Sequence, residues 1–263
     1  MFALADQPQS IGKNLDNGIK LYIAGLAKVL PLTFIAASLG VVPDLLNVTR
    51  PSIDNPAVGA GMLGFLLVYV VVMIVVSFAI YGAVIYQYGA IATGHSVSMM
   101  DSVKRGFRCI PRLLGGGILY VLAIMIGMVL LVIPGIILMV SLALFSTAIM
   151  LDDEKAVDSL KLSHSLVWGN WWRTVILFTV PMFIIMALYF LLGAIFGVSM
   201  MAGGAANLNQ ESIAQTALMV SIAGAAINAV VTPLFYGITI VVYNDLKLRR
   251  SGSDLQAKLA AAT

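Results

Sequence analysis

Long apolar stretches dominate the chain, and short polar segments separate them. A helix needs about 20 apolar residues to cross the roughly 30 Å hydrocarbon core of a bilayer, because it rises only 1.5 Å per residue. By this measure the sequence predicts six membrane-spanning helices, at residues 29–48, 61–92, 112–132, 135–151, 174–201 and 212–243. The pattern therefore predicts an all-α integral membrane protein.

The third and fourth spans are divided by a single turn signal. From Leu113 to Met150 the chain carries no charge, and only the pair Pro134-Gly135 interrupts it. As one helix this stretch would be about 57 Å long, which is nearly two crossings. Because proline followed by glycine favours a reversal, we expect a tight hairpin there, and thus three hairpins in all.

Each hairpin follows a polar segment with the periodicity of a surface helix. Apolar residues recur at steps of three and four, with Lys, Arg and Asp elsewhere on the wheel. A short basic amphipathic helix at a membrane edge is expected to lie in the interfacial plane. We therefore expect three cytoplasmic interfacial helices, with apolar stripes of Ile11, Leu15, Ile19, Tyr22 and Leu26; Val97, Met100, Val103, Phe107 and Ile110; and Val157, Leu160, His164, Trp168 and Trp171.

A short phrase opens two of these segments. It reads Asp-Ser-Val-Lys at 101–104 and Asp-Ser-Leu-Lys at 158–161, and residues 16–20 are a looser version. The phrase suggests one module used three times: interfacial helix, span, reversal, span. Modules inserted the same way would be related by an axis along the membrane normal. We predict one polytopic domain over 1–263 with repeats at 10–93, 97–151 and 153–243 and a cytoplasmic tail at 244–263.

Basic residues predict the orientation. Of the fifteen Lys and Arg, all but Arg50 fall before, between or after the hairpins. The positive-inside rule places these segments in the cytoplasm, with both termini. The predicted outer loops, around 49–60 and 201–210, are too short to form an external domain.

Composition agrees with a lipid environment and limits the chemistry. The chain is 60% apolar and 10% charged, so it has too little polar surface to cover itself in water. Its only cysteine, Cys109, excludes an internal disulfide and a cysteine-based metal cluster. No ionisable residue lies deep in a predicted span, which argues against proton relays and voltage sensors. No motif of a hydrolase, nucleotide-binding loop or zinc protease occurs, so we expect neither enzymatic activity nor a cofactor.

Some polar and small residues inside the spans are candidates for specific contacts. Asn228 precedes Thr232-Pro233 by one turn and is expected to bond across helices, or to touch a lipid or substrate. The motif from Gly193 to Gly197 and the alanine-serine face of the last span favour internal packing, with homodimerisation as the alternative. The deepest polar side chains are Ser77, Ser141, Asn228 and Thr232.

Residues 85–180 resemble the bacterial inner-membrane YciC family. The similarity rests on Gly-His-Ser-Val-Ser at 94–98, Pro-Arg-Leu at 111–113, and the stretch from the Pro-Gly-Ile hairpin at 134–136 through the acidic run and serine-rich helix to Asn-Trp-Trp at 170–172. The tail at 233–255 is similar to the ending of a broader group that includes membrane domains of glycerophosphodiester phosphodiesterases. The resemblance implies a multi-span protein of the bacterial inner membrane, and it supplies no catalytic residues.

These features favour a non-enzymatic inner-membrane protein that organises, senses or moves lipid or another amphipathic molecule. Its basic islands would touch anionic headgroups, or would only fix the topology. The alternative is a transporter or exporter component for an apolar peptide or small molecule, which requires a cavity between modules. A membrane enzyme would need His95, His164 and acidic groups to converge. Membrane lipids, another membrane protein or a second copy are the expected partners, and nucleic acid is not. The candidate headgroup contacts are Lys104, Arg105, Arg108, Arg112 and Arg173.

Overall fold

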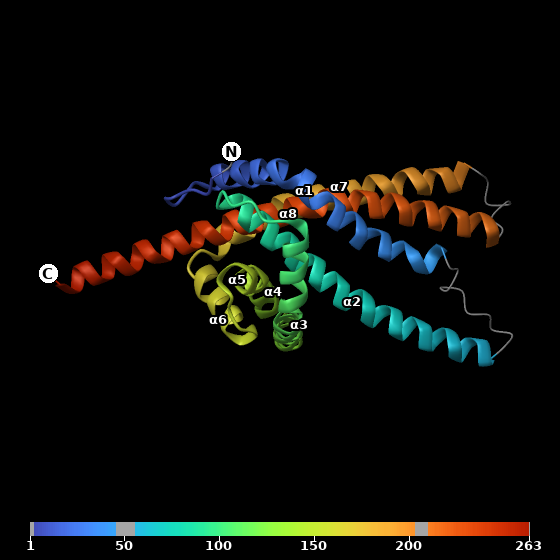
Figure 1. Cartoon of the computed structure of the whole chain (residues 1–263), viewed down its shortest axis with the longest axis horizontal. Coiled ribbons are helices and arrows are strands. Elements are labelled where there is room, and N and C mark those ends of the chain that lie inside the picture. The colour runs from blue at the N-terminus through green and yellow to red at the C-terminus, as the bar shows by residue number, and fades with distance from the viewer. Residues whose placement is uncertain (1–2, 46–55, 203–209, 263) are drawn as a thin grey trace.

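The chain folds entirely into helices over the residues that its computed structural model describes, which are 3–45, 56–202 and 210–262 (Figure 1). Within these described ranges, six stretches are long and apolar enough to cross a membrane, with Val132–Asp152 counted as one stretch although it holds two short helices. The all-α, multi-pass prediction is thereby confirmed, whereas the predicted loops around 49–60 and 201–210 fall largely outside the described residues. The helices are α1 (Ile11–Leu45), α2 (Pro56–Ala92), α3 (Met99–Leu130), α4 (Val132–Ser141), α5 (Phe145–Asp152), α6 (Ala156–Val167), α7 (Trp171–Ala202) and α8 (Gln210–Ala262).

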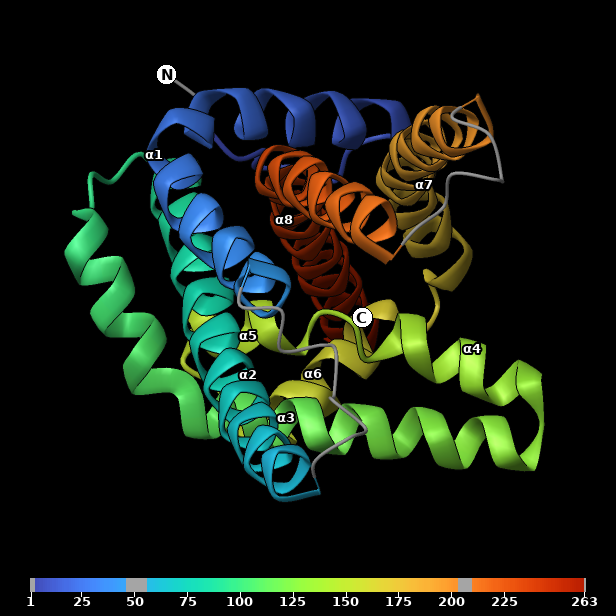
Figure 2. The ribbon, with the colours of Figure 1, turned by 90° about the vertical axis from the view of Figure 1, so that its right-hand side faces the viewer.

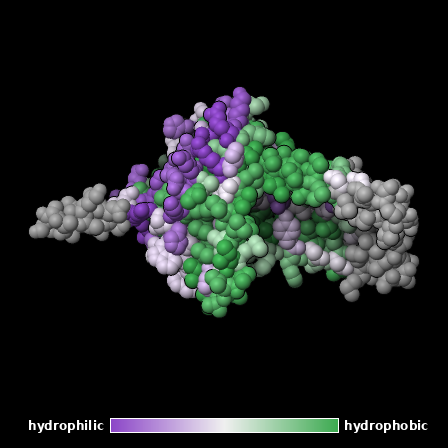
Figure 3. Space-filling model, turned by 90° about the horizontal axis from the view of Figure 1, so that it is seen from below, coloured by the Kyte–Doolittle hydropathy of each residue, from purple (hydrophilic) through white to green (hydrophobic). Residues whose placement is uncertain are grey.

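The long helices extend from a central region toward one end of the molecule. Figure 1 shows α2, α7, the second half of α1 and the first half of α8 pointing the same way. The α3–α4 pair runs across that direction, side by side in Figure 2. Figure 3 shows polar residues gathered toward the opposite end and apolar residues over the middle of the molecule. We call this polar end the charged face; it includes Arg105, Arg112, Asp152, Asp153, Asp245 and Lys247.

The interfacial segments are not all separate helices. The first half of α1 runs across the top of Figure 2, and the helix then bends toward the viewer without a break. The second interfacial segment likewise continues into its span as the single helix α3. Only α6 is divided from the following span, by a turn at residues 168–170. Of the three segments predicted as interfacial helices, only α6 is a separate helix, and the interfacial placement of all three stays a prediction.

The start of α3 explains one role of the repeated phrase. Ser98 caps the helix by accepting a hydrogen bond from the Asp101 backbone N–H at 3.1 Å, and its hydroxyl donates to the Asp101 carboxylate at 2.7 Å. An acidic side chain in the first turn also complements the helix dipole. Asp158 occupies the first turn of α6 in the same way.

The chain reverses three residues earlier than the proline-glycine pair predicts. Leu131 is extended, with φ −164° and ψ 145°, and α4 begins at Val132. Pro134 therefore lies in the first turn of α4, where its missing N–H costs no helical bond. A Cβ on Gly127 would lie 2.9 Å from the Gly135 Cα, so the two glycines permit a close approach of α3 and α4.

The predicted span 135–151 is broken into α4 and α5. The hydroxyl of Ser163, on α6, accepts a hydrogen bond from the Leu144 N–H at 3.1 Å and donates to the Ser141 carbonyl at 2.8 Å. These contacts satisfy backbone groups that the break releases, as an apolar environment requires. The break therefore depends on a contact from a different helix, which local sequence does not reveal.

The faces that the three interfacial segments bury are also not the predicted apolar stripes. Each segment buries small or weakly polar residues at similar spacing, and the first of them are Asn14, Ser102 and Ser159. Met100, Phe107 and Trp168, which belong to the predicted apolar stripes, are exposed. The apolar stripes are only partly covered: Leu15, Val103 and Leu160 are half-buried against the hydrophobic core, whereas the exposed members would meet lipid. The buried sets are Asn14, Gly18, Leu21 and Gly25; Ser102, Gly106, Cys109 and Leu113; and Ser159, Ser163, Leu166 and Val167.

These buried faces pack on the ends of other spans. The first segment packs on α8, the second on α2 and the third on α5. Ala229 is fully buried, and its carbonyl accepts a hydrogen bond from Thr33 at 2.7 Å, which confirms internal packing for that part of the small-residue face of α8. A Cβ on Gly193 or Gly197 would meet nothing within 4 Å, so the prediction of internal packing at this motif is wrong.

Candidate functional site

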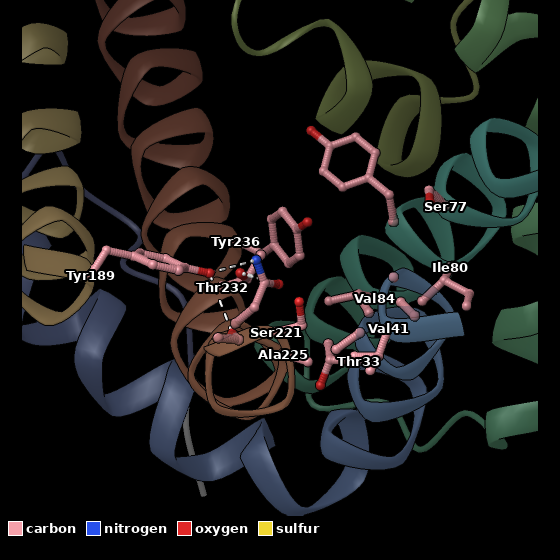
Figure 4. Close-up of a pocket in the computed structure, with 16 residues that line it drawn as sticks. Thr33, Val41, Ser77, Ile80, Val84, Tyr189, Ser221, Ala225, Thr232 and Tyr236 are labelled. Carbon is pink, nitrogen blue, oxygen red and sulfur yellow. Dashed lines mark hydrogen bonds between the residues drawn. The ribbon is translucent and has the colours of Figure 1, made fainter. Parts of the chain in front are cut away.

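A cavity of about 400 Å³ lies between α1, α2, α7 and α8 (Figure 4). We call it the inter-helix cavity. Its walls combine apolar side chains with hydroxyl and amide groups, and none of the residues that line it carries a formal charge. It therefore suits a ligand that is mostly apolar and has neutral hydrogen-bonding groups. Its polar lining residues are Thr33, Ser77, Tyr81, Tyr189, Ser221, Asn228, Thr232 and Tyr236.

A short chain of hydrogen bonds runs along one wall. Thr232 donates to the Asn228 side-chain oxygen at 2.9 Å, and the Asn228 amide donates to the Tyr189 hydroxyl at 3.4 Å. Figure 4 shows Tyr189 and Thr232 approaching this wall from α7 and α8. These bonds leave the second Asn228 amide proton without a partner among the described residues. Near the other end, Ser221 donates to the Asp44 carboxylate.

Two tyrosines of the cavity wall contact each other, and one of them reaches a buried serine. The Tyr81 hydroxyl lies 2.5 Å from the Ser146 hydroxyl, and the Tyr81 ring meets the Tyr236 ring edge to face at 5.0 Å. The three residues come from α2, α5 and α8. We call them the tyrosine cluster.

A second cavity, of about 510 Å³, lies at the charged face. Its polar wall holds the Lys247–Asp152 ion pair at 2.8 Å, and the Tyr243 hydroxyl donates to Asp152 at 2.5 Å. His95 lines the same cavity, with its Nδ1 3.0 Å from the Thr93 hydroxyl. Its apolar wall consists of Leu4, Ala90, Val97, Met150, Leu151 and Ile240. We call it the charged-face cavity.

Most of the predicted headgroup cations have partners in the chain. Arg105 and Arg112 pair with Asp153 at 2.8 and 2.6 Å. Arg173 pairs with Asp245 at 3.1 Å. Their binding to lipid would compete with these ion pairs, so the structure does not favour them as free headgroup contacts.

Lys104 and Arg108 differ from these cations. Both are exposed, and neither has a partner among the described residues. They flank the exposed Phe107 on α3. This mixed basic and apolar surface is suited to the edge of an anionic membrane.

Two residues of the acidic run that precedes α6, Asp152 and Asp153, form ion pairs with other helices and do not cap the start of α6. Asp153 adopts a left-handed conformation with φ 60° at the end of α5, which directs its carboxylate toward α3. The Arg105 guanidinium beside it, with Arg112, holds the pKa of this carboxyl below its usual value. Asp152 instead faces α8.

The structure brings together three of the four predicted intramembrane polar residues. Ser77, Asn228 and Thr232 line the inter-helix cavity. Ser141 lies elsewhere, buried at the end of α4, where its hydroxyl has no partner among the described residues. Ser141 therefore does not share the inter-helix cavity with the other three residues.

The two histidines do not converge. His95 lies near Asp152 in the charged-face cavity, whereas the His164 ring stacks against Trp168 with centroids 5.0 Å apart. Among the described residues no group of three His, Cys, Asp or Glu could hold a metal ion.

The tyrosine cluster was not predicted from the sequence. Its signal there is Tyr-Gly-x-x-Ile-x-x-Tyr, which occurs at 81–88 and again at 236–243. In the fold the first residues of the two phrases, Tyr81 and Tyr236, meet with ring centroids 5.0 Å apart.

Taken together, the fold defines a multi-pass helical membrane protein with a polar cavity between its spans. Residues 88–246 match the model of a family described as a domain of unknown function, DUF7847, and since this is more than half of the chain, the protein belongs to that family. No curated protein and no solved structure matches the chain.

Proposed function

We propose that the protein is a non-enzymatic bacterial inner-membrane protein that binds an amphipathic molecule of the bilayer in its inter-helix cavity. The observation that carries the proposal is the cavity itself: apolar walls with neutral hydrogen-bonding groups from four helices. A lipid-like ligand would place its chain against the apolar walls and its ester or hydroxyl groups against Asn228, Thr232 and Ser77. Binding of this kind supports organising, sensing or moving the ligand.

The charged face would meet the membrane surface on the cytoplasmic side, with both termini inside. This orientation is supported by the concentration of basic residues there. Lys104 and Arg108 are the proposed contacts to anionic headgroups, because each Lys or Arg near such a surface contributes about 1 kcal/mol. A reporter inserted after Ser102 should be active on the cytoplasmic side, and activity in the periplasm would overturn the orientation.

Native mass spectrometry of the detergent-purified protein tests the cavity proposal. The wild-type protein should retain lipid adducts, and the pair Asn228→Leu and Thr232→Val should lose most of them. Ser38→Ala is the matched control, because this exposed α1 hydroxyl bonds the Ile35 carbonyl of its own helix and no other group within the described part of the chain. Equal adducts in the wild-type protein, the cavity variant and the control would refute the proposal.

Lys104→Glu with Arg108→Glu tests the surface contribution separately. This variant should bind vesicles of phosphatidylglycerol more weakly while keeping the adducts of the cavity. If vesicle binding is unchanged, these cations serve topology alone.

The second candidate is a transporter or exporter component for an apolar peptide or small molecule. The specific observation that favours it is the presence of the charged-face cavity in addition to the inter-helix cavity. Transport predicts that a cell lacking the protein accumulates the transported molecule on one side of the membrane. A pure lipid-binding role predicts no such change.

A further inference from the structure

The charged-face cavity is a binding space of its own. No described residue lines both this cavity and the inter-helix cavity. Its lining comes from the ends of α2 and α5, the second half of α8, the loop before α3 and the segment before α1. Its volume of about 510 Å³ lies in the range of sites for small molecules and headgroups. The chemistry of its ligand can therefore be inferred from its own lining residues.

One positive and one negative charge lie side by side in this cavity. The ammonium group of Lys247 is 3.0 and 2.8 Å from the two carboxylate oxygens of Asp152. The buried Tyr243 donates its hydroxyl proton to the same carboxylate, and the Lys247 ammonium lies 5.5 Å from the centre of the Tyr243 ring. With histidine neutral, Lys247 and Asp152 are the only charged residues among the described ones that line the cavity. Its lining thus has both charges and no net charge.

This arrangement favours a ligand group that also carries both charges. An anion would gain the attraction of Lys247 but would meet the repulsion of Asp152, and a cation would meet the reverse. A zwitterion can instead place its phosphate on Lys247 and its ammonium on Asp152, so that each residue exchanges one counter-charge for another. The side chains of Lys247 and Asp152 are 45% and 27% exposed, so their own pairing is weak and is easily replaced.

The rest of the lining suits the part of such a ligand next to its charged groups. His95, Ser96 and Asn244 add neutral hydrogen-bonding groups. The cavity also has an apolar wall, which would accept a glycerol backbone and the first carbons of an acyl chain. Because the cavity lies at the charged face, a bound headgroup would be at the proposed membrane surface. The apolar lining residues are Leu4, Ala90, Val97, Met150, Leu151 and Ile240.

We infer that the charged-face cavity binds a zwitterionic phosphodiester, with its phosphate on Lys247 and its ammonium group on Asp152. This chemistry is shared by the headgroup of phosphatidylethanolamine and by the water-soluble glycerophosphoethanolamine. The site goes beyond the proposed function, because the inter-helix cavity has no formally charged lining residue and gives no basis for selecting a headgroup by its charge.

A titration of the detergent-purified, full-length protein tests this site. Short-chain phosphatidylethanolamine and phosphatidylglycerol with the same acyl chains are added separately, and native mass spectrometry measures the bound fraction. The wild-type protein should bind phosphatidylethanolamine severalfold more tightly, because phosphatidylglycerol is a pure anion.

Two charge-neutralising variants should change this preference in different ways. Asp152→Asn removes the partner of the ammonium group and frees Lys247, so phosphatidylethanolamine binding should fall severalfold while phosphatidylglycerol binding rises. Lys247→Gln removes the partner of the phosphate, so binding of phosphatidylethanolamine should fall and that of phosphatidylglycerol should not rise. Because the ion pair is weak, both variants should unfold near the wild-type temperature. If one variant fails to fold, the other decides.

The matched control neutralises another pair of opposite charges. Lys161 and Asp158 lie 3.9 Å apart on α6 and line neither cavity. Lys161→Gln with Asp158→Asn should therefore keep the wild-type preference. A rise in phosphatidylglycerol binding in Asp152→Asn is also not expected from a general loss of structure, which would weaken the binding of both lipids.

Competition with glycerophosphoethanolamine distinguishes the two sources of the ligand. If it displaces phosphatidylethanolamine at similar concentrations, the site takes a soluble phosphodiester, and if it does not, the site takes the lipid. Equal binding of the two lipids by the wild-type protein overturns the inference, as does unchanged binding of both by Asp152→Asn. Either result leaves the inter-helix proposal to its own test with Asn228→Leu and Thr232→Val. Failure of that test alone would leave the charged-face site intact.

Discussion

The carboxylate of Asp245 and the guanidinium of Arg173 lie 3.1 Å apart at a site where Asp245 is only 3% exposed. Asp245 also pairs with Arg249 at 2.9 Å and accepts the backbone N–H of Gln9 at 2.7 Å. The guanidinium of Arg173 in turn donates to the Gln9 carbonyl. One carboxylate thus joins the segment before α1, the start of α7 and the inner part of α8.

Removing this carboxylate should destabilise the protein strongly. In Asp245→Ala, two arginines lose their counter-charge at a largely buried position, which costs about 3–5 kcal/mol. Thermal unfolding in detergent, followed by the loss of monomeric protein, measures the effect. Asp16→Ala is the control, because the exposed Asp16–Lys20 pair contributes less than about 1 kcal/mol. Equal losses in the two variants would contradict the role assigned to Asp245.

The close contact of α3 with α2 should tolerate no side chain at Gly106. A Cβ there would overlap the carbonyl oxygen of Ala79, which is backbone and cannot swing aside. Gly106→Ala should therefore cost about 1–3 kcal/mol through overpacking. In Gly115→Ala, on the same helix, the new Cβ would make an ordinary 3.5 Å contact with Ala156, so the gain in helix propensity, up to about 1 kcal/mol, should prevail. Relative to the wild-type protein, the unfolding midpoint should fall in Gly106→Ala and rise in Gly115→Ala.

The hydroxyl of Ser163 should contribute more to the stability of the folded protein than the other buried hydroxyls of α6. Ser163→Ala leaves the buried Leu144 N–H without a partner, which costs about 1–3 kcal/mol. Ser159→Ala is the matched control, since among the described residues that buried hydroxyl bonds only the Ala156 carbonyl of its own helix. Hydrogen exchange should also become faster at residues 142–145 in the Ser163 variant alone. Unchanged exchange there would show that another group supports the break.

Acidification should weaken the link between α3 and the end of α5. The arginines lower the pKa of Asp153 in the folded protein, so its contribution to stability is present above the pKa of the unfolded chain and is lost as pH falls through the lower folded value. Unfolding midpoints measured from neutral to acidic pH should decline less in Asp153→Asn than in the wild-type protein. Glu154→Gln, which removes a neighbouring carboxylate without an ion pair in the described chain, should retain the wild-type decline.

Hydropathy predicted the helical spans well, because a helix must supply its own backbone hydrogen bonds in lipid whatever its neighbours are. It located the reversal only approximately, at Pro134-Gly135 instead of Leu131, since proline is tolerated in a first helical turn. It could not show the break between α4 and α5, which a hydroxyl from α6 stabilises.

Part of the inter-helix cavity was also predicted from the sequence. Asn228, Thr232 and Ser77 stood out because polar atoms are unusual within apolar spans, and all three line the cavity. The fully buried positions of the interfacial segments were not predicted, because apolar residues can also face outward where lipid covers the protein, and stripe residues such as Leu15 and Val103 are only partly buried. Small residues such as Gly106 face inward instead, where they let helices approach closely. The repeat boundaries and the headgroup contacts of Lys104 and Arg108 stay predictions.

The crosswise direction of the α3–α4 pair has a mechanical consequence for the membrane around it. Its tip is strongly apolar and open, with Val129 85% and Leu130 71% exposed, and the pair lies beside the charged face. In a bilayer whose normal follows the long helices, this pair would lie across the normal, although both of its helical stretches are long and apolar enough to span. Its open apolar tip would then meet lipid from the side, so the pair would enlarge the protein's cross-section in the membrane plane.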